Sequence, residues 1–126
     1  MDDKSQYWLE LAEYDLETAH AMLETKRYLY VGFMCHQVIE KALKSLLAQT
    51  GTPPYIHSLS KLAELSNLYC QFDDEQKNII DSLEPLNIQA RYPEEKEQIF
   101  RSLSAERCSK LLSNTERLYQ WIKNTL

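Results

Sequence analysis

The chain has 126 residues and a formal net charge of −5, which argues against a protein that coats duplex nucleic acid, because such proteins need excess Lys and Arg for the phosphates. A small local anion or nucleotide site is still compatible with this charge. Only 2 Gly and 4 Pro are present, few for a sheet protein with many tight turns, so the composition predicts an all-helical fold. No apolar run approaches the ~20 residues of a membrane span, the charged N-terminus lacks the apolar core of a signal peptide, and three isolated cysteines indicate a reducing compartment. We therefore expect a cytoplasmic location.

The first predicted helix spans about residues 4–25. Its apolar residues recur at helical spacing on one face, and they are Trp8, Leu11, Ala12, Leu16, Ala19, Met22 and Leu23. Asp15 falls in the middle of this apolar stripe. Because an unpaired buried carboxylate is costly, Asp15 needs a partner unless the stripe opens onto water at that point.

The second predicted helix, residues 28–50, is the most apolar segment. Its main face carries Val31, Cys35, Val38, Ile39, Ala42, Leu43 and Leu46, and two further residues, Met34 and Leu47, widen the apolar arc beyond half the circumference. A helix this apolar usually has neighbours on several sides. We therefore expect it to be the central helix, with a second subunit as one possible neighbour, and to end before Gly51 and the following prolines.

Two shorter helices follow. The third spans about residues 58–69, with Ser58 as its cap and with Leu65 and Tyr69 among its inward residues. The fourth begins after Asp73, which has capping-box spacing with Gln76.

The C-terminal part of the chain contains one segment without clean periodicity, residues 88–101, which we predict to be the longest irregular segment. Pro93 supports this prediction because it biases the preceding residue away from helical angles. The last helix is predicted over residues 102–124. The whole pattern predicts an up-and-down antiparallel bundle of four to five helices that forms a single domain over residues 1–126.

The second helix also carries polar residues close together. His36, Gln37, Glu40, Lys41 and Lys44 lie along the edge of the apolar arc and the adjacent polar strip. One interpretation is a solvated strip with ordinary pairs four residues apart, each worth a few tenths of a kcal/mol. The other is a site, because a central helix leaves little free surface and its polar strip must then face a groove, a neighbour or a subunit interface.

Two other places could carry chemistry. His57 precedes a predicted helix start and could stabilise the turn, or it could bind a phosphate or a partner carboxylate at the bundle end. Arg91 could be a surface residue, could reach back to neutralise Asp15, or could bind a phosphate, since a planar guanidinium suits either anion. Tyr92 could stack on a base or simply pack.

Motifs for metal or cofactor chemistry are absent. The sequence contains no Gly-rich phosphate loop, no CxxC pair and no HExxH. Its three histidines, at positions 20, 36 and 57, lack metal-ligand spacing, and His20 is expected to face solvent. We therefore expect neither a metal nor a cofactor.

The combination of four stretches resembles the HEPN family of small helical domains. These stretches are WLELAEYDLETAHAML (8–23), YLYVGFMCHQVIEKALKSLL (28–47), HSLSKL (57–62) and ARYP (90–93), which together extend over nearly the whole chain. The resemblance implies an up-and-down helical bundle, usually paired as a homodimer through its central helices. It also implies an association with a minimal nucleotidyltransferase, in some cases as a toxin–antitoxin pair.

One branch of this family consists of metal-independent ribonucleases, marked by an Arg followed after four to six residues by a His. This sequence departs from that mark, because no His occurs after His57 and eight residues separate Arg27 from His36. We therefore expect a non-catalytic module that binds a nucleotide, RNA or a partner protein. The alternatives are a ribonuclease with a degenerate site and a purely structural helical dimer, in which Asp15 would pair with Lys41, His36 or Arg91.

Overall fold

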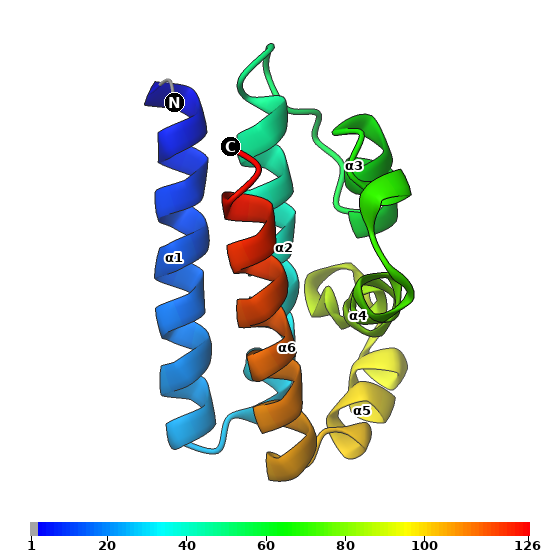
Figure 1. The fold of residues 1–126 in the computed structure, drawn as a ribbon. Helices are drawn as coiled ribbons and strands as arrows, with labels where there is room; N and C mark the ends of the chain where they lie inside the picture. The colour runs from blue at the N-terminus through cyan, green and yellow to red at the C-terminus, as the bar shows by residue number, and fades with distance from the viewer. Residues whose placement is uncertain (1–2) are drawn as a thin grey trace.

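The computed structural model describes residues 3–126, and all of the regular structure in this part is helical (Figure 1). Its α-helices are α1 (Asp3–Glu24), α2 (Tyr28–Leu47), α3 (Leu59–Leu65), α4 (Asp74–Leu83), α5 (Pro93–Ser102) and α6 (Ala105–Lys123). Three short 3-10 helices complete the elements, η1 (Tyr69–Gln71), η2 (Glu84–Leu86) and η3 (Ile88–Ala90). The predicted all-helical bundle is confirmed, and none of the helices in residues 3–126 is long and apolar enough to cross a membrane.

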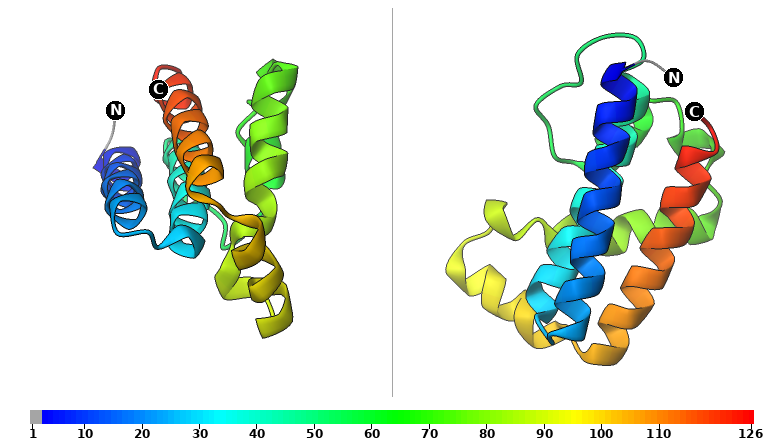
Figure 2. Two further views of the ribbon diagram at one scale, coloured as in Figure 1. Left: turned by 90° about the horizontal axis from the view of Figure 1, so that it is seen from below. Right: turned by 90° about the vertical axis from the view of Figure 1, so that its left-hand side faces the viewer.

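Three long helices, α1, α2 and α6, run side by side along the length of the molecule (Figure 1). Seen from below, α1 and the segment containing α3, α4 and α5 lie on opposite sides of α2 and α6 (Figure 2). Helix α2 is therefore central, as its apolar arc predicts. Its fully buried apolar residues are Val31, Cys35, Val38, Ile39, Ala42 and Leu43.

The prediction of an irregular segment over residues 88–101 was wrong, because α5 occupies most of it. Pro93 is the first residue of α5, a position where proline is favoured since its missing N–H needs no partner. Glu94 and Glu95 in the first turn and Arg101 in the last turn complement the helix dipole. The helix has no buried residue, so it lacks the apolar stripe by which a packed helix is recognised in a sequence.

Several element boundaries also differ from the prediction. Helix α2 ends at Leu47 rather than residue 50, and Gly51 does not adopt a left-handed conformation. Helix α3 ends at Leu65 rather than residue 69, because Asn67 takes the left-handed backbone angles that close the helix. Leu65 was expected to face inward, but it is 46% exposed. The caps at Ser58 and Asp73 are present as predicted.

The cysteines are free, and two of them, Cys35 and Cys108, are buried, whereas Cys70 is exposed. Gly32 lets the chain after α4 approach α2 closely, because a Cβ at this position would lie 3.3 Å from Leu86 Cδ1. This close approach brings η2 and η3 beside the polar strip of α2, where the candidate site lies.

Candidate functional site

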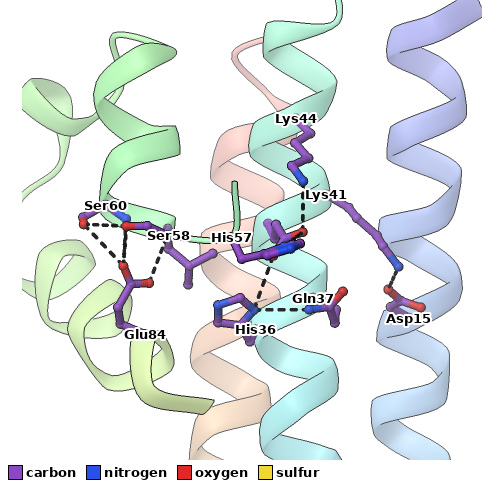
Figure 3. A network of polar contacts seen from close by, with 11 residues as sticks. Asp15, His36, Gln37, Lys41, Lys44, His57, Ser58, Ser60 and Glu84 are labelled. Atoms are coloured by element: carbon purple, nitrogen blue, oxygen red, sulfur yellow. Dashed lines mark hydrogen bonds and ion pairs between the residues drawn. The ribbon is translucent and has the colours of Figure 1, made fainter. Parts of the chain in front are cut away.

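The polar residues of α2 point in two directions (Figure 3). Lys41 points towards α1, where its ammonium group forms an ion pair with the carboxylate of Asp15. Asp15 is 8% exposed, so this partner supplies the neutralisation that its position in the apolar stripe requires. The alternative in which Arg91 neutralises Asp15 is wrong, since Arg91 donates from Nε to the Pro85 carbonyl, 3.2 Å away.

Glu40 points in the other direction and is 4% exposed. Lys44, one helical turn further along α2 and equally buried, donates from Nζ to Glu40 Oε2 at 3.2 Å. Nδ1 of His57 lies 3.1 Å from both carboxylate oxygens, so the loop before α3 is held against α2. A buried carboxylate with a cation on one side and an imidazole on the other is compensated in charge and in hydrogen bonds.

Trp8 closes this group on the side of α1. Nζ of Lys44 lies 5.6 Å from the centre of the Trp8 ring, a cation–π contact from which water is largely excluded because Lys44 is buried. The Lys44–Glu40–His57 contacts thus join α1, α2 and the loop before α3. The predicted polar residues at positions 40 and 44 are interior residues rather than a solvated strip.

His36 is also interior, with 1% of its surface exposed. Its Nδ1 lies 3.8 Å from Glu40 Oε1 and 3.4 Å from Nε2 of Gln37. Burial lowers the pKa of His36 below its ordinary value, and the carboxylates of Glu40 and Glu84 only partly oppose this effect. The ring is therefore neutral at physiological pH and can both donate and accept a hydrogen bond.

Glu84 at the end of α4 holds the beginning of α3 in place. Its carboxylate accepts hydrogen bonds from the Ser58 hydroxyl and the Leu59 N–H, each at 2.8 Å, and from the Ser60 N–H at 3.4 Å (Figure 3). These donors satisfy the carboxylate and orient the loop that carries His57. They also fix the distance between α3 and the η2–η3 segment.

Two adjoining hollows lie between α2, the His57 loop and the η2–η3 segment, and they have His57, Asn87 and Ala90 in common. One has a volume of about 210 Å³ and is lined in addition by His36, Ser58, Glu84 and Arg91. The other has a volume of about 270 Å³ and is lined in addition by Gln37 and Gln89. We call the two together the α2 hollow.

The α2 hollow brings together some of the predicted site residues and leaves others out. His36, Gln37, His57 and Arg91 line it, although they come from three separate parts of the sequence. Glu40 and Lys44 lie behind His57 and support it. Two predicted residues do not line this hollow: Lys41 points to Asp15 on α1, and Tyr92 is 75% exposed.

Five residues of the α2 hollow were not predicted as site residues. Ser58 was predicted only as a helix cap, and the other four are Glu84, Asn87, Gln89 and Ala90. These four lie in the η2–η3 segment, where the sequence shows no periodicity that would indicate which side chains face inward. The one available signal was Pro85, since a proline after a predicted helix indicates that the chain turns there. The sequence does not show towards which helix it turns.

The arrangement of these helices can be compared with known proteins. The sequence matches the HEPN domain over residues 5–125, nearly the whole chain. The chain belongs to the HEPN family. This confirms the resemblance that was inferred from the four sequence stretches.

Two solved structures share this HEPN fold. TT1696 from Thermus thermophilus superimposes with a TM-score of 0.81 at 22% identity, covering 99% of this chain and 100% of TT1696. ST0689, described as an archaeal HEPN homologue, gives a TM-score of 0.74 at 20% identity, with 98% of both chains covered. At these identities the likeness establishes the fold alone. A comparison with curated proteins gives no significant match.

Proposed function

We propose that this HEPN chain is a non-catalytic module that binds a nucleotide or an RNA end in the α2 hollow. The observation that carries the proposal is that His36, His57 and Arg91 line the same hollow as the amides of Gln37 and Asn87. Amide groups offer donors and acceptors that match the edges of a base, and a guanidinium is well suited to a phosphate.

The charges around the hollow are compatible with a phosphate group. Both nearby carboxylates already have partners. Lys44 pairs with Glu40, and the donors at the start of α3 satisfy the hydrogen-bonding oxygens of Glu84, which keeps its charge. Arg91 forms only a loose pair with Glu95, at 3.6 Å between partly exposed side chains. Such a pair contributes little, so a phosphate can replace Glu95 at modest cost.

Calorimetric titration with AMP and with ATP tests this proposal. We expect saturable heat for the wild-type protein and weaker binding for Arg91→Gln and His57→Ala. Arg101→Gln is the matched control, because this residue pairs with Glu97 on the exposed face of α5 and does not line the hollow. Absence of saturable heat for both nucleotides, or equal loss in the control variant, would reject the nucleotide site.

We further propose that residues 1–126 act as one domain that pairs with a second copy in the cytoplasm. Three residues that are at least partly exposed form one stripe on α2, namely Tyr30, Met34 and Gln37. Pairing across this stripe would place the two α2 hollows near each other, because Gln37 belongs to both the stripe and the hollow. Sedimentation should then give twice the 14.8 kDa of one chain, and Met34→Glu should restore the single-chain mass. A single-chain mass for the wild type at micromolar concentration contradicts this proposal.

The proposed partner of this module is a minimal nucleotidyltransferase in a toxin–antitoxin-like pair, as the family membership implies. Its test is whether a nucleotidyltransferase gene lies beside this gene and whether the two purified proteins form a complex of defined stoichiometry. A purified neighbour that does not bind this chain would reject the pairing.

A second candidate function is a metal-independent ribonuclease with a rearranged site. The sequence lacks the Arg-x4–6-His mark, yet Arg91, His36 and His57 line one hollow even though the histidines precede the arginine in the chain. Incubation with total RNA in the presence of EDTA separates this candidate from simple binding. Intact RNA at high protein concentration supports the non-catalytic function, and cleavage that is lost in Arg91→Gln supports the nuclease.

A further inference from the structure

Helix α1 lies at the edge of the bundle, and its outer side is not covered by any other helix of the described chain (Figure 2, right). A row of residues on this side is spaced alternately by four and by three positions. The row consists of Tyr7, Leu11, Tyr14, Thr18 and Ala21, and we call it the α1 seam. This spacing is the one by which a helix packs against another helix in a coiled coil.

The α1 seam presents large apolar surface to solvent. Tyr7 is 59% exposed and Tyr14 is 69% exposed, and Leu11 between them is partly exposed. The hydroxyl group of Thr18 donates to the Tyr14 carbonyl at 3.1 Å, so the seam holds no free hydroxyl donor at that point. Exposed aromatic residues in a continuous row are typical of a protein interface, whereas scattered ones are not.

A second row on α1 follows the seam at heptad spacing. It consists of Glu10, Glu17 and Glu24, and all three side chains are exposed. Within residues 3–126, Glu17 and Glu24 form no ion pair, and Glu10 only accepts a hydrogen bond from Gln6 at 3.2 Å. In a helical pair, residues that flank the seam face the flanking residues of the partner and select it by charge.

These charges distinguish between possible occupants of the seam. If a second copy of α1 packed on the seam in antiparallel orientation, the glutamate row of one copy would face the glutamate row of the other. In parallel orientation, the glutamate row would face Trp8, Asp15 and Met22 of the other copy. Neither orientation supplies a cation. An anionic membrane surface is also disfavoured, because helices that lie on membranes carry Lys and Arg beside the apolar face. A helix with basic residues beside an apolar face suits both rows, because its apolar face can pack on the α1 seam while its basic residues pair with the glutamates.

We propose that the α1 seam is a docking surface for an amphipathic helix of a different protein that has Lys or Arg along one flank. This surface is separate from the α2 hollow and goes beyond the proposed nucleotide site. A hollow of about 360 Å³ adjoins the N-terminal end of the seam and is lined by Tyr7, Trp8 and Pro53 together with Asp3, Lys4 and Thr52. It can accommodate a large apolar side chain at the end of the docked helix.

The test uses the full chain and two synthetic peptides of about 21 residues, three heptads each. Both peptides have the same apolar a and d positions, and they differ in carrying Lys or Glu at the flanking positions. Fluorescence anisotropy should show saturable binding of the Lys peptide and at least ~10-fold weaker binding of the Glu peptide. The variant Glu10→Lys, Glu17→Lys, Glu24→Lys should reverse this preference.

Two matched pairs of variants locate the binding on the chain. Tyr14→Ser should weaken binding of the Lys peptide by about 10-fold or more, whereas Tyr92→Ser, a similarly exposed tyrosine before α5, should leave it unchanged. Glu17→Lys should weaken it, and Glu64→Lys on the exposed side of α3 should not. The four replaced residues are exposed, and circular dichroism checks that each variant folds.

Three results would overturn the proposal. The first is no saturable binding of the Lys peptide, and the second is equal binding of both peptides. The third is a change in sedimentation mass on Tyr14→Ser, which would make the seam an interface between copies of this chain. None of these results depends on whether AMP or ATP binds in the α2 hollow.

Discussion

Helix α2 makes two ion pairs that differ in burial. The side chains of Glu40 and Lys44 are 5% and 6% exposed and face the His57 loop, whereas the side chains of Asp15 and Lys41 are 12% and 21% exposed and join α2 to α1. The buried pair contacts two histidines, both of which line the hollow beside Arg91. The outer pair lines neither part of the α2 hollow. The comparison teaches that polar residues on one helix strip can have different roles, one pair supporting a candidate site and the other joining two helices.

The largest expected effect comes from breaking the buried pair. Lys44→Met leaves the Glu40 carboxylate buried without its cation, so we expect a loss of about 3–5 kcal/mol in the free energy of unfolding, measured by urea denaturation. Glu40→Gln combined with Lys44→Met should recover part of this loss, because neither charge then remains buried. An effect of Lys44→Met below about 1 kcal/mol would show that the pair is open to water.

A smaller coupling is expected between Asp15 and Lys41, because their side chains are partly exposed. A double-mutant cycle of Asp15→Asn and Lys41→Met should give a coupling energy of about 1 kcal/mol. The control cycle pairs Asp15→Asn with Arg91→Gln, which should be additive within about 0.5 kcal/mol because the two residues are not in contact. Coupling between Asp15 and Arg91, with none between Asp15 and Lys41, would contradict the assignment of Lys41 as the partner of Asp15.

The pH dependence of stability tests the burial of His36. Its pKa is lowered in the folded protein, so between that value and the ordinary pKa of His the unfolded chain binds more protons. Stability should therefore be fully present above pH of about 6.5 and should decrease as the pH falls through the lowered pKa. His36→Gln should flatten this decrease. A slope that is identical in wild type and His36→Gln would contradict the burial of this ring.

The smallest effect on stability is expected at Arg91, which contributes to the hollow but not to the interior. Arg91→Gln removes one hydrogen bond to the Pro85 carbonyl and a loose pair with Glu95, so the free energy of unfolding should change by less than about 0.5 kcal/mol. Thermal denaturation measures this change. A small change in the free energy of unfolding together with weaker nucleotide binding would identify Arg91 as a ligand contact. A loss of more than about 2 kcal/mol would instead identify it as a structural residue.

The long helices could be predicted from the sequence because α1, α2 and α6 bury apolar stripes of several turns. The need of Asp15 for a partner was also visible, since its position in the stripe follows from helix geometry alone. The identity of that partner was not, because Lys41 and Arg91 are both cations and only the packing angle of α1 on α2 places one of them within reach. Helix α5 was missed because none of its residues is fully buried, although Ile99 packs partly against the core.

The candidate site could be predicted in part. His36 and Gln37 were recognisable because they lie at the edge of a wide apolar arc on α2. Their proximity to Asn87 and Gln89 depends on the contact of Leu86 with Gly32, which brings two segments together that lie far apart in the sequence. This contact is between a methyl group of Leu86 and a glycine, which has no side chain. A single contact of this kind produces no periodic pattern in the sequence.

The central claim, that the α2 hollow is a ligand site, is tested most directly by the histidine ring signals in NMR during titration with AMP. The chain provides its own control, because His36 and His57 line the hollow and His20 lies on α1 beside Glu116. We predict saturable shifts of the ring signals of His36 and His57, with that of His20 unchanged. Signals that all stay in place, or that all move together without saturation, would contradict the claim.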